Sequence, residues 1–176
     1  LDVPDLGKKV DFSSLKYFMY GAAPMSVEKL KQALEVIGPV MTGGYGQTEA
    51  PASISCLTPS EHFVGGKIAP DERLSSVGRP NPLIRVEIMN DANEILPRGR
   101  TGEICVRGDL VMKGYYKNPK ATEEASKFGW HHTGDIGLKD ADGFVYIVDR
   151  KRDMIISGGF NIYPSDLEGI LQKHPA

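Results

Sequence analysis

Apolar and polar positions along this chain change from a helical spacing near the start to a strand-like alternation further on. Near the start, the apolar positions at helical spacing are Val27, Leu30, Leu34 and Ile37. Ser26 precedes them as a helix cap, and Gly38-Pro39 ends the pattern. The apolar segment 15–20 predicts a buried strand before this helix. A short strand to about Met41 is expected after it, followed by a loop over 42–45.

From about Ser76 the spacing becomes that of β-strands. The alternating apolar positions are Ile84, Val86, Ile88, Ile104 and Val106. Turn-rich segments at 90–93 and 97–100 separate these strands. The first part of the chain therefore predicts an α/β unit, and the second part predicts a small, mostly β subdomain.

Two later strands, 136–138 and 144–148, are expected to be joined by a four-residue turn at 140–143. Such a turn would set Asp135 opposite Val148. Asp135 and Arg150 would then be diagonal neighbours on one face, within reach of one ligand.

The strand pattern ends after Arg150, where the polar run 151–153 is followed by the apolar run 154–156. We therefore predict a domain boundary at Arg150. Further on, Ser165 and Glu168 have the spacing of a capping box for a last helix, which is our interpretation of Glu168.

The composition of the 176 residues is that of an ordinary globular protein, with 40% hydrophobic residues and a net charge of -2. Without a basic stripe or an apolar span, a small-molecule partner is favoured over nucleic acid or a membrane. Two cysteines, Cys56 and Cys105, are too few for a disulfide framework, so a reducing cytoplasmic setting is expected. No acids, cysteines or histidines have metal-ligand spacing, and His131 and His132 are interpreted as surface or packing residues.

Four short motifs carry the candidate chemistry: Gly21-Ala22-Ala23, Tyr45-Gly46-Gln47-Thr48-Glu49, Thr133-Gly134-Asp135 and Asp149-Arg150. The first motif suits a loop that approaches adenine, and the second offers a hydroxyl and a carboxylate for a phosphate and its Mg²⁺. The third offers an acid for ribose hydroxyls, and the fourth offers a cation. Together they indicate an ATP-using site.

With Gly102-Glu103-Ile104 and the segment 158–164 at compatible positions, this set resembles the superfamily of acyl-adenylate-forming enzymes, and most of all the free-standing acyl-CoA synthetases. The resemblance implies three parts. Residues 1–75 would be an α/β part of the N-terminal AMP-binding domain, and 76–149 its β subdomain, a distorted barrel. Residues 150–176 would begin an α+β C-terminal domain.

The resemblance also implies roles for the loop after the first helix. Tyr45 would stack on adenine, with Gly46 and Gln47 close by, Thr48 would donate to the α-phosphate, and Glu49 would hold Mg²⁺. Thr48 and Glu49 are thus the catalytic candidates. Taken alone, the motif favours a loop leading into a helix capped by Thr48, and only the company of the other motifs favours the ATP-using site.

The other motifs each have a structural alternative as well. Gly21-Ala22-Ala23 would let backbone approach the ligand closely, or it is a tight turn before the helix. Asp135 would accept hydrogen bonds from the ribose hydroxyls, or it caps a turn. Arg150 would reach ribose or phosphate, or it is a solvated charge.

At the C-terminal end, the family places its hinge at the position of Arg152, where it usually has Asp or Lys. Gly158-Gly159 resembles the loop that lines the tunnel for the pantetheine of coenzyme A, and it is equally typical of a β-turn. By the same resemblance Asn161 belongs to the cofactor-binding residues.

Two hallmarks of the family have no counterpart in the chain: a phosphate loop ending in Lys before Gly21, and a catalytic Lys near the C-terminus. We therefore expect an internal fragment of a longer enzyme, inactive as a ligase by itself. The expected parent is an ATP-dependent ligase of a fatty or aromatic acid with coenzyme A. The alternatives are an adenylation domain that loads a carrier-protein thiol, and a non-catalytic nucleotide-binding module.

Overall fold

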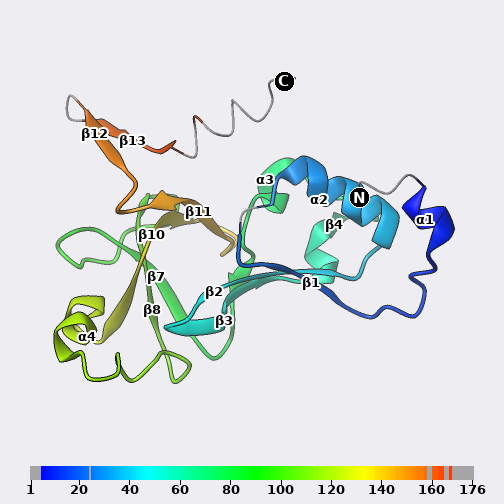
Figure 1. Cartoon of the computed structure of the whole chain (residues 1–176). Helices are drawn as coiled ribbons and strands as arrows, with labels where there is room; N and C mark the ends of the chain where they lie inside the picture. Colours follow the sequence, from blue (N-terminus) through cyan, green and yellow to red (C-terminus); the bar gives the residue numbers. More distant parts are fainter. Residues whose placement is uncertain (1–4, 24, 158–159, 165–166, 168–176) are drawn as a thin grey trace.

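The computed structural model describes residues 5–23, 25–157, 160–164 and 167, and its first part is an α/β unit (Figure 1). Its elements are α1 (Leu6–Lys9), β1 (Phe18–Gly21), α2 (Val27–Ile37), β2 (Met41–Gln47), β3 (Ala50–Leu57) and β6 (Arg79–Pro80). The strands form one sheet in the order β1-β2-β3-β6. β1 runs parallel to β2, whereas β3 runs antiparallel to both of its neighbours, β2 and β6.

The helix α2 has the predicted cap and the predicted buried face. The Ser26 hydroxyl accepts a hydrogen bond from the backbone N–H of Lys29 at 3.3 Å, and Gly38 ends the helix with φ 88°. Leu30 and Leu34 are almost fully buried in a cluster with Met41 of β2. The sequence prediction for this helix is therefore confirmed.

Replacing Ser26 with Ala is expected to lower the free energy of unfolding by about 1 kcal/mol, because the cap satisfies an N–H that the helix itself cannot. Urea denaturation of the 176-residue chain measures this change. Ser14→Ala is the matched control, since Ser14 is exposed and outside any helix. Equal loss in both variants would show that the cap contributes nothing specific.

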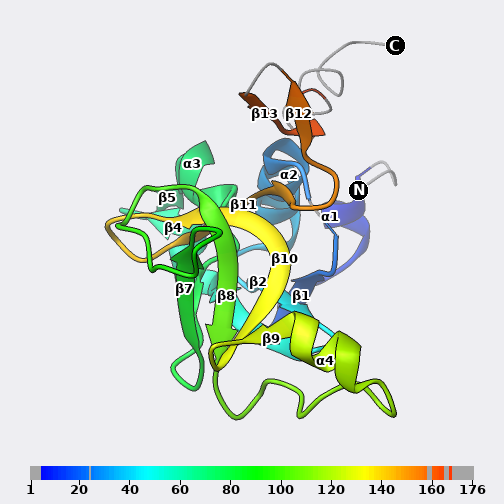
Figure 2. The same cartoon turned by 90° about the vertical axis from the view of Figure 1, so that its left-hand side faces the viewer.

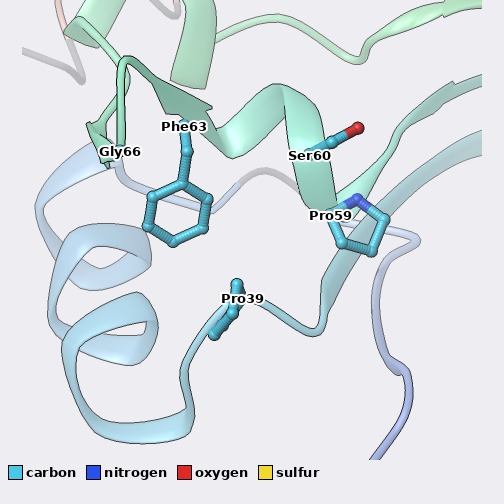
Figure 3. Close-up of a pocket in the computed structure, with 5 residues that line it drawn as sticks. All are labelled: Pro39, Pro59, Ser60, Phe63 and Gly66. Carbon is cyan, nitrogen blue, oxygen red and sulfur yellow. The ribbon is translucent and has the colours of Figure 1, made fainter.

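The connection from β3 to β6 folds back onto α2. It consists of η1 (Pro59–His62), β4 (Phe63–Val64), β5 (Lys67–Ile68) and α3 (Asp71–Leu74). A pocket of about 700 Å³ is lined by Pro39, Pro59, Ser60, Phe63 and Gly66. Figure 3 shows these residues on the connection and just after the end of α2. None of these five residues is charged, and none belongs to the four motifs. This pocket therefore carries none of the predicted chemistry.

The second sheet contains the strands with period-two patterns, as predicted. Its elements are β7 (Arg85–Met89), β8 (Gly102–Arg107), α4 (Pro119–Ala125), β9 (Ser126–Lys127), β10 (Trp130–Lys139) and β11 (Val145–Arg150). The order is β11-β10-β8-β7, with β9 paired to β10 (Figure 2). β11 and β7 are not paired with each other, so the described strands form an open sheet. The predicted distorted barrel is not closed, and α4 is a helix within the subdomain that was expected to be mostly β.

The two sheets share one hydrophobic core. Tyr45 and Ile54 of the first sheet pack with Val86, Ile104 and Val145 of the second. Backbone hydrogen bonds join the layers where Val77 N–H donates to the Val145 carbonyl and Val145 N–H donates to the Gly78 carbonyl. This shared core holds the motifs of the first sheet in a fixed relation to those of the second.

The last described strands are β12 (Ile155–Ser157) and β13 (Phe160–Ile162), which form a separate hairpin beyond β11 (Figure 1). The domain boundary at Arg150 stays a prediction. The capping box of Ser165 and Glu168 lies outside the described residues. Across the part of the chain that the structure describes, no helix has the length and apolarity needed to cross a membrane.

Two predictions for the first sheet are wrong. The strand expected over 15–20 is β1, and it is exposed rather than buried, with Met19 69% accessible, because among the described strands β1 pairs with β2 alone and lies at the sheet edge. The loop expected over 42–45 is part of β2. Its two glycines signal a loop in isolation, but pairing with strands on both sides keeps the segment extended.

Candidate functional site

The site is organised around a buried hydrogen bond between two of the motifs. The Tyr45 hydroxyl donates to Asp135 Oδ2 at 2.6 Å, although the two residues are 90 positions apart. Both side chains are largely buried, with 8% of Tyr45 and 9% of Asp135 exposed. Burial and then the Asp135 charge raise the pKa of Tyr45 far above its ordinary value. Tyr45 therefore stays protonated and continues to donate to Asp135.

The turn that carries Asp135 is held by side chains on both sides. The Thr133 hydroxyl donates to the Ile104 carbonyl at 2.8 Å and accepts from the Asp135 N–H at 3.1 Å. Gly134 has φ 73°, which side chains rarely adopt, and its N–H donates to Glu103 Oε1 at 3.2 Å. This turn therefore fixes the position of the Asp135 carboxylate before any ligand arrives.

Arg150 lies directly opposite Asp135 in the β10-β11 ladder, with Arg150 Nε 3.6 Å from Asp135 Oδ1. The predicted proximity is confirmed, but the predicted register, with Val148 opposite, is wrong. The loop is one residue longer than expected, because Lys139 pairs with Val145. A bulge then adds Val148 as an extra residue. These two one-residue shifts keep Asp135 and Arg150 on the same face, since side chains alternate with a period of two.

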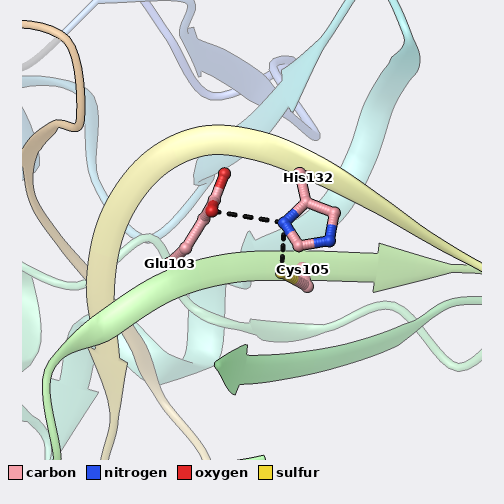
Figure 4. A group of neighbouring side chains, drawn as sticks. All are labelled: Glu103, Cys105 and His132. Atoms are coloured by element: carbon pink, nitrogen blue, oxygen red, sulfur yellow. Dashed lines mark hydrogen bonds and ion pairs between the residues drawn. The ribbon is translucent and has the colours of Figure 1, made fainter. Parts of the chain in front are cut away.

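A network that the sequence analysis missed supports this turn. His132 Nδ1 lies 3.2 Å from Glu103 Oε2 and 3.5 Å from Cys105 Sγ (Figure 4). Lys151 Nζ donates to Glu103 Oε2 at 3.1 Å. Burial raises the pKa of Glu103, but hydrogen bonds from His132 and Lys151 outweigh it and leave this pKa lowered. The ionised Glu103 therefore connects β8, the Gly134 turn and Lys151.

The same three residues, Glu103, Cys105 and His132, place possible metal-ligating atoms within 4.8 Å of one another. The prediction that no such cluster exists is thus wrong, since the ladder between β8 and β10 joins residues that are distant in sequence. Burial raises the pKa of the Cys105 thiol to about 12, which keeps it protonated. Both Glu103 oxygens also already accept hydrogen bonds from protein donors. The cluster therefore acts as structural support for the turn.

His131 faces away from this network and is 3% exposed, so it is a packing residue rather than a surface residue. Burial lowers its pKa, against the charge of Glu49, which raises it. A second pocket, of about 550 Å³, is lined by residues 106–109, 111–113, 126 and 129–131, which include His131 and Trp130. Met112, one of these residues, donates its N–H to the Glu49 carbonyl at 2.7 Å.

Glu49 lies in the turn that joins β2 to β3, and its carboxylate has a partner. The Tyr115 hydroxyl donates to Glu49 Oε1 at 2.6 Å. This hydrogen bond is the main reason that the pKa of Glu49 is lowered. An ionised carboxylate at a partly exposed turn is a fitting ligand for a hard cation such as Mg²⁺. Tyr115 gave no signal in the sequence analysis, because nothing in the sequence relates it to a residue 66 positions earlier.

Thr48 and Glu49 form a β-turn, so the alternative of a helix capped by Thr48 is wrong. Thr48 is exposed and its neighbour Gln47 donates from Nε2 to the Thr133 carbonyl at 3.4 Å. Gly46 lies between Tyr45 and Gln47 at a register shift of the β2-β3 ladder. The loop motif therefore connects directly to the turn that carries Asp135.

Gly21 is the last residue of β1, and Ala22 and Ala23 form an exposed bend after it. A Cβ on Gly21 would lie 2.3 Å from the Gly44 carbonyl oxygen, so only glycine allows β1 to lie this close to β2. Ala22 has φ 65°, an uncommon conformation for a residue with a side chain. Gly21 therefore allows a close approach between two strands, and its predicted close approach to a ligand stays a prediction.

The predicted hinge follows an anchored residue. Lys151 Nζ donates to Asp91 at 2.8 Å as well as to Glu103, and Lys151 N–H donates to the Gly134 carbonyl at 2.8 Å. Arg152 is exposed, and Arg152 Nε is paired with its neighbour Asp153 at 3.5 Å. The segment that follows β11 is therefore attached strongly to the β sheet at Lys151 and weakly at Arg152. Gly158 and Gly159 lie outside the described residues, and the backbone of Asn161 belongs to β13.

Comparison with known proteins agrees with this arrangement. Residues 2–116 match the family described as AMP-binding enzyme. The chain is 41% identical over 176 residues to the medium/long-chain-fatty-acid–CoA ligase FadD8 of Mycobacterium tuberculosis, covering 100% of this chain and 29% of that protein.

Solved structures of similar proteins cover nearly the whole chain. The amide bond synthetase McbA of Marinactinospora thermotolerans has a TM-score of 0.89 and 40% identity, over 99% of this chain and 34% of that one. O-succinylbenzoate coenzyme A synthetase (MenE) of Bacillus subtilis, in complex with ATP and magnesium ion, has a TM-score of 0.76 and 32% identity, over 97% of this chain and 35% of that one. The chain belongs to the AMP-binding enzyme family, and it spans about a third of the length of these relatives.

Proposed function

We propose that this chain forms the nucleotide-binding centre of a longer ATP-dependent acid–thiol ligase, which joins a carboxylic acid to coenzyme A through an acyl-AMP intermediate. The observation that carries the proposal is the Tyr45–Asp135 hydrogen bond with Arg150 opposite, which joins three of the four motifs. The family membership and the 41% identity to a fatty-acid–CoA ligase support it.

In the first half-reaction, a carboxylate oxygen of the acid attacks the α-phosphorus of ATP, and pyrophosphate leaves. This step needs positioning and charge neutralisation rather than a general base. Asp135 has carboxylate lone pairs beyond those used by Tyr45 and Arg150, and these would accept the ribose hydroxyls. Tyr45 and Gly21-Ala22-Ala23 would bind adenine, and Arg150 would contact ribose or phosphate.

The catalytic residues of this step would be Thr48 and Glu49. The exposed Thr48 hydroxyl would donate to the α-phosphate, and Glu49 would be the ligand of Mg²⁺. Bound Mg²⁺ supplies positive charge that neutralises the phosphates. The lowered pKa of Glu49 suits this role, because a metal ligand must be deprotonated.

In the second half-reaction, the thiol of coenzyme A attacks the acyl carbonyl and AMP leaves. Arg152 would be the hinge for the domain rotation between the two steps, and Gly158, Gly159 and Asn161 would lie along the path of the thiol. A fatty or aromatic acid is the proposed substrate class. Acid-dependent release of pyrophosphate by the longer ligase, measured over a panel of acids, would identify it.

The acceptor is tested in the same assay. Coenzyme A, a phosphopantetheinylated carrier protein and an amine are supplied in turn to the enzyme loaded with acyl-AMP, because the similar McbA is an amide bond synthetase. Product formed with coenzyme A supports the proposal. Product formed only with the carrier protein or only with the amine would replace the thiol acceptor that we propose.

Asp135→Ala in the longer ligase is expected to weaken ATP binding about ten- to hundredfold, since hydrogen bonds to a charged group contribute about 1.5–3 kcal/mol. Isothermal titration calorimetry measures this affinity. Asp142→Ala is the matched control, because Asp142 is an exposed residue of the turn before β11. Unchanged ATP affinity in the Asp135 variant would make Asp135 a turn residue only.

A further inference from the structure

The segment between β8 and α4 brings a tyrosine to the carboxylate of Glu49. The Tyr115 hydroxyl donates to Glu49 Oε1 at 2.6 Å, while Met112 N–H donates to the Glu49 carbonyl at 2.7 Å. Glu49 is therefore held at both its side chain and its backbone by one segment that lies outside all four motifs. The carboxylate still has its second oxygen for a cation.

The position of Tyr115 is itself fixed by α4. Tyr115 N–H donates to the Thr122 hydroxyl at 2.9 Å, and that hydroxyl donates to the Asn118 carbonyl at 2.9 Å. Asn118 caps α4 by accepting from the Ala121 N–H at 3.1 Å. A Cβ on Gly114 would lie 2.8 Å from the Thr122 side chain, so the glycine permits this close contact. The phenol therefore reaches Glu49 from a short, well-bonded framework.

We propose that Tyr115 is a positioning residue for the metal ligand Glu49, which it orients so that the free oxygen faces the Mg²⁺ of bound MgATP. The proposal rests on the proposed function, since it takes Glu49 as the ligand. The hydrogen bond from the Tyr115 hydroxyl restricts the rotation of this carboxylate. Hydrogen bonds that orient a ligand from outside the metal's own contacts commonly change metal affinity about 10- to 100-fold when they are removed.

The neighbouring tyrosine provides a matched control. Tyr116 is 86% exposed, against 38% for Tyr115, and its ring lies against the Lys117 ammonium, 5.3 Å from the ring centroid. Phe at either position removes only a hydroxyl. A difference between the two variants therefore reports the contact with Glu49 and no general effect on the segment.

The test measures binding and needs no turnover. Calorimetry gives the affinity of the longer ligase for α,β-methylene ATP, once with Mg²⁺ and once with EDTA. Four proteins are compared: the wild type, Tyr115→Phe, Tyr116→Phe and Glu49→Gln. We expect Tyr115→Phe to reduce the gain in affinity that Mg²⁺ gives by about tenfold. Tyr116→Phe should keep the wild-type gain, and the affinity in EDTA should be the same in all four proteins.

The outcomes separate the two ideas. If Glu49→Gln abolishes the Mg²⁺-dependent gain and Tyr115→Phe leaves it intact, the positioning role is wrong and the proposed function stands. If Glu49→Gln leaves the gain intact, Glu49 is not the metal ligand, and the proposed metal site falls together with this inference. If Tyr115→Phe weakens nucleotide binding by the same factor with Mg²⁺ and with EDTA, the variant damages the nucleotide site as a whole. That result would also overturn the positioning role.

Discussion

Glu49→Gln in the longer ligase is expected to slow acyl-AMP formation by about 10²- to 10³-fold, the usual cost of removing one well-placed charge-stabilising group. Gln keeps the shape of the side chain and removes its charge, and the lowered pKa of Glu49 means that this charge is present near neutral pH. The acid-dependent exchange of pyrophosphate into ATP measures the effect. The rate constant at saturating MgATP should carry this loss, and the affinity for MgATP should fall as well, because Glu49 is the proposed ligand of Mg²⁺.

Glu35→Gln is the control, since Glu35 lies on the exposed side of α2, away from the site. It makes the same chemical change at a solvated position. A loss of less than threefold in the Glu49 variant would contradict the role assigned to this carboxylate, and the thermal midpoint of both variants shows whether folding is affected.

The elements that were predicted correctly are those in which local pattern and tertiary packing agree. α2 has a cap, an apolar face and a glycine stop within one short stretch, and each of these acts over a few residues. β7 and β8 bury their alternate positions against the first sheet, so the period-two pattern of Val86, Ile88 and Ile104 was sufficient. For these elements the local sequence pattern alone was enough to predict the structure.

The elements that were predicted wrongly are those whose structure depends on pairing between β-strands. The glycines of 42–45 favour a loop locally, but two neighbouring strands hold them extended in β2. Thr48 is a good helix cap in isolation, yet the chain reverses there into β3. The bulge at Val148 likewise depends on the strand opposite. Such features follow from contacts between distant residues, which periodicity within one segment does not contain.

The candidate site shows the same division. The motifs that contain Tyr45, Asp135 and Arg150 were found from the sequence, and the structure brings these residues together. The supporting residues Glu103 and Tyr115 became visible in these roles only in the fold. Their partners lie on other strands or loops, at separations of 31 and 66 residues.

The second large effect is expected at the predicted hinge, where Arg152→Pro should separate the two half-reactions. Lys151 is bound to Asp91, Glu103 and the Gly134 carbonyl, whereas Arg152 is exposed. Proline fixes φ at this first weakly attached position. A domain that rotates about it would then be held in one arrangement. We expect acyl-AMP formation to stay within about threefold and thioester formation to fall about 10²-fold, as a misplaced reacting group commonly costs.

The measurement compares pyrophosphate exchange with the release of acyl-CoA for each variant of the longer ligase. Arg152→Ala is the control, because it removes the side chain and leaves φ free, so it should slow neither step. Gly159→Leu, at a position outside the described residues, should slow only thioester formation if that loop lines the path of the thiol. Equal loss of both half-reactions in Arg152→Pro would mean that the segment after Lys151 belongs to the adenylation site itself, and the rotation about Arg152 would have to be abandoned.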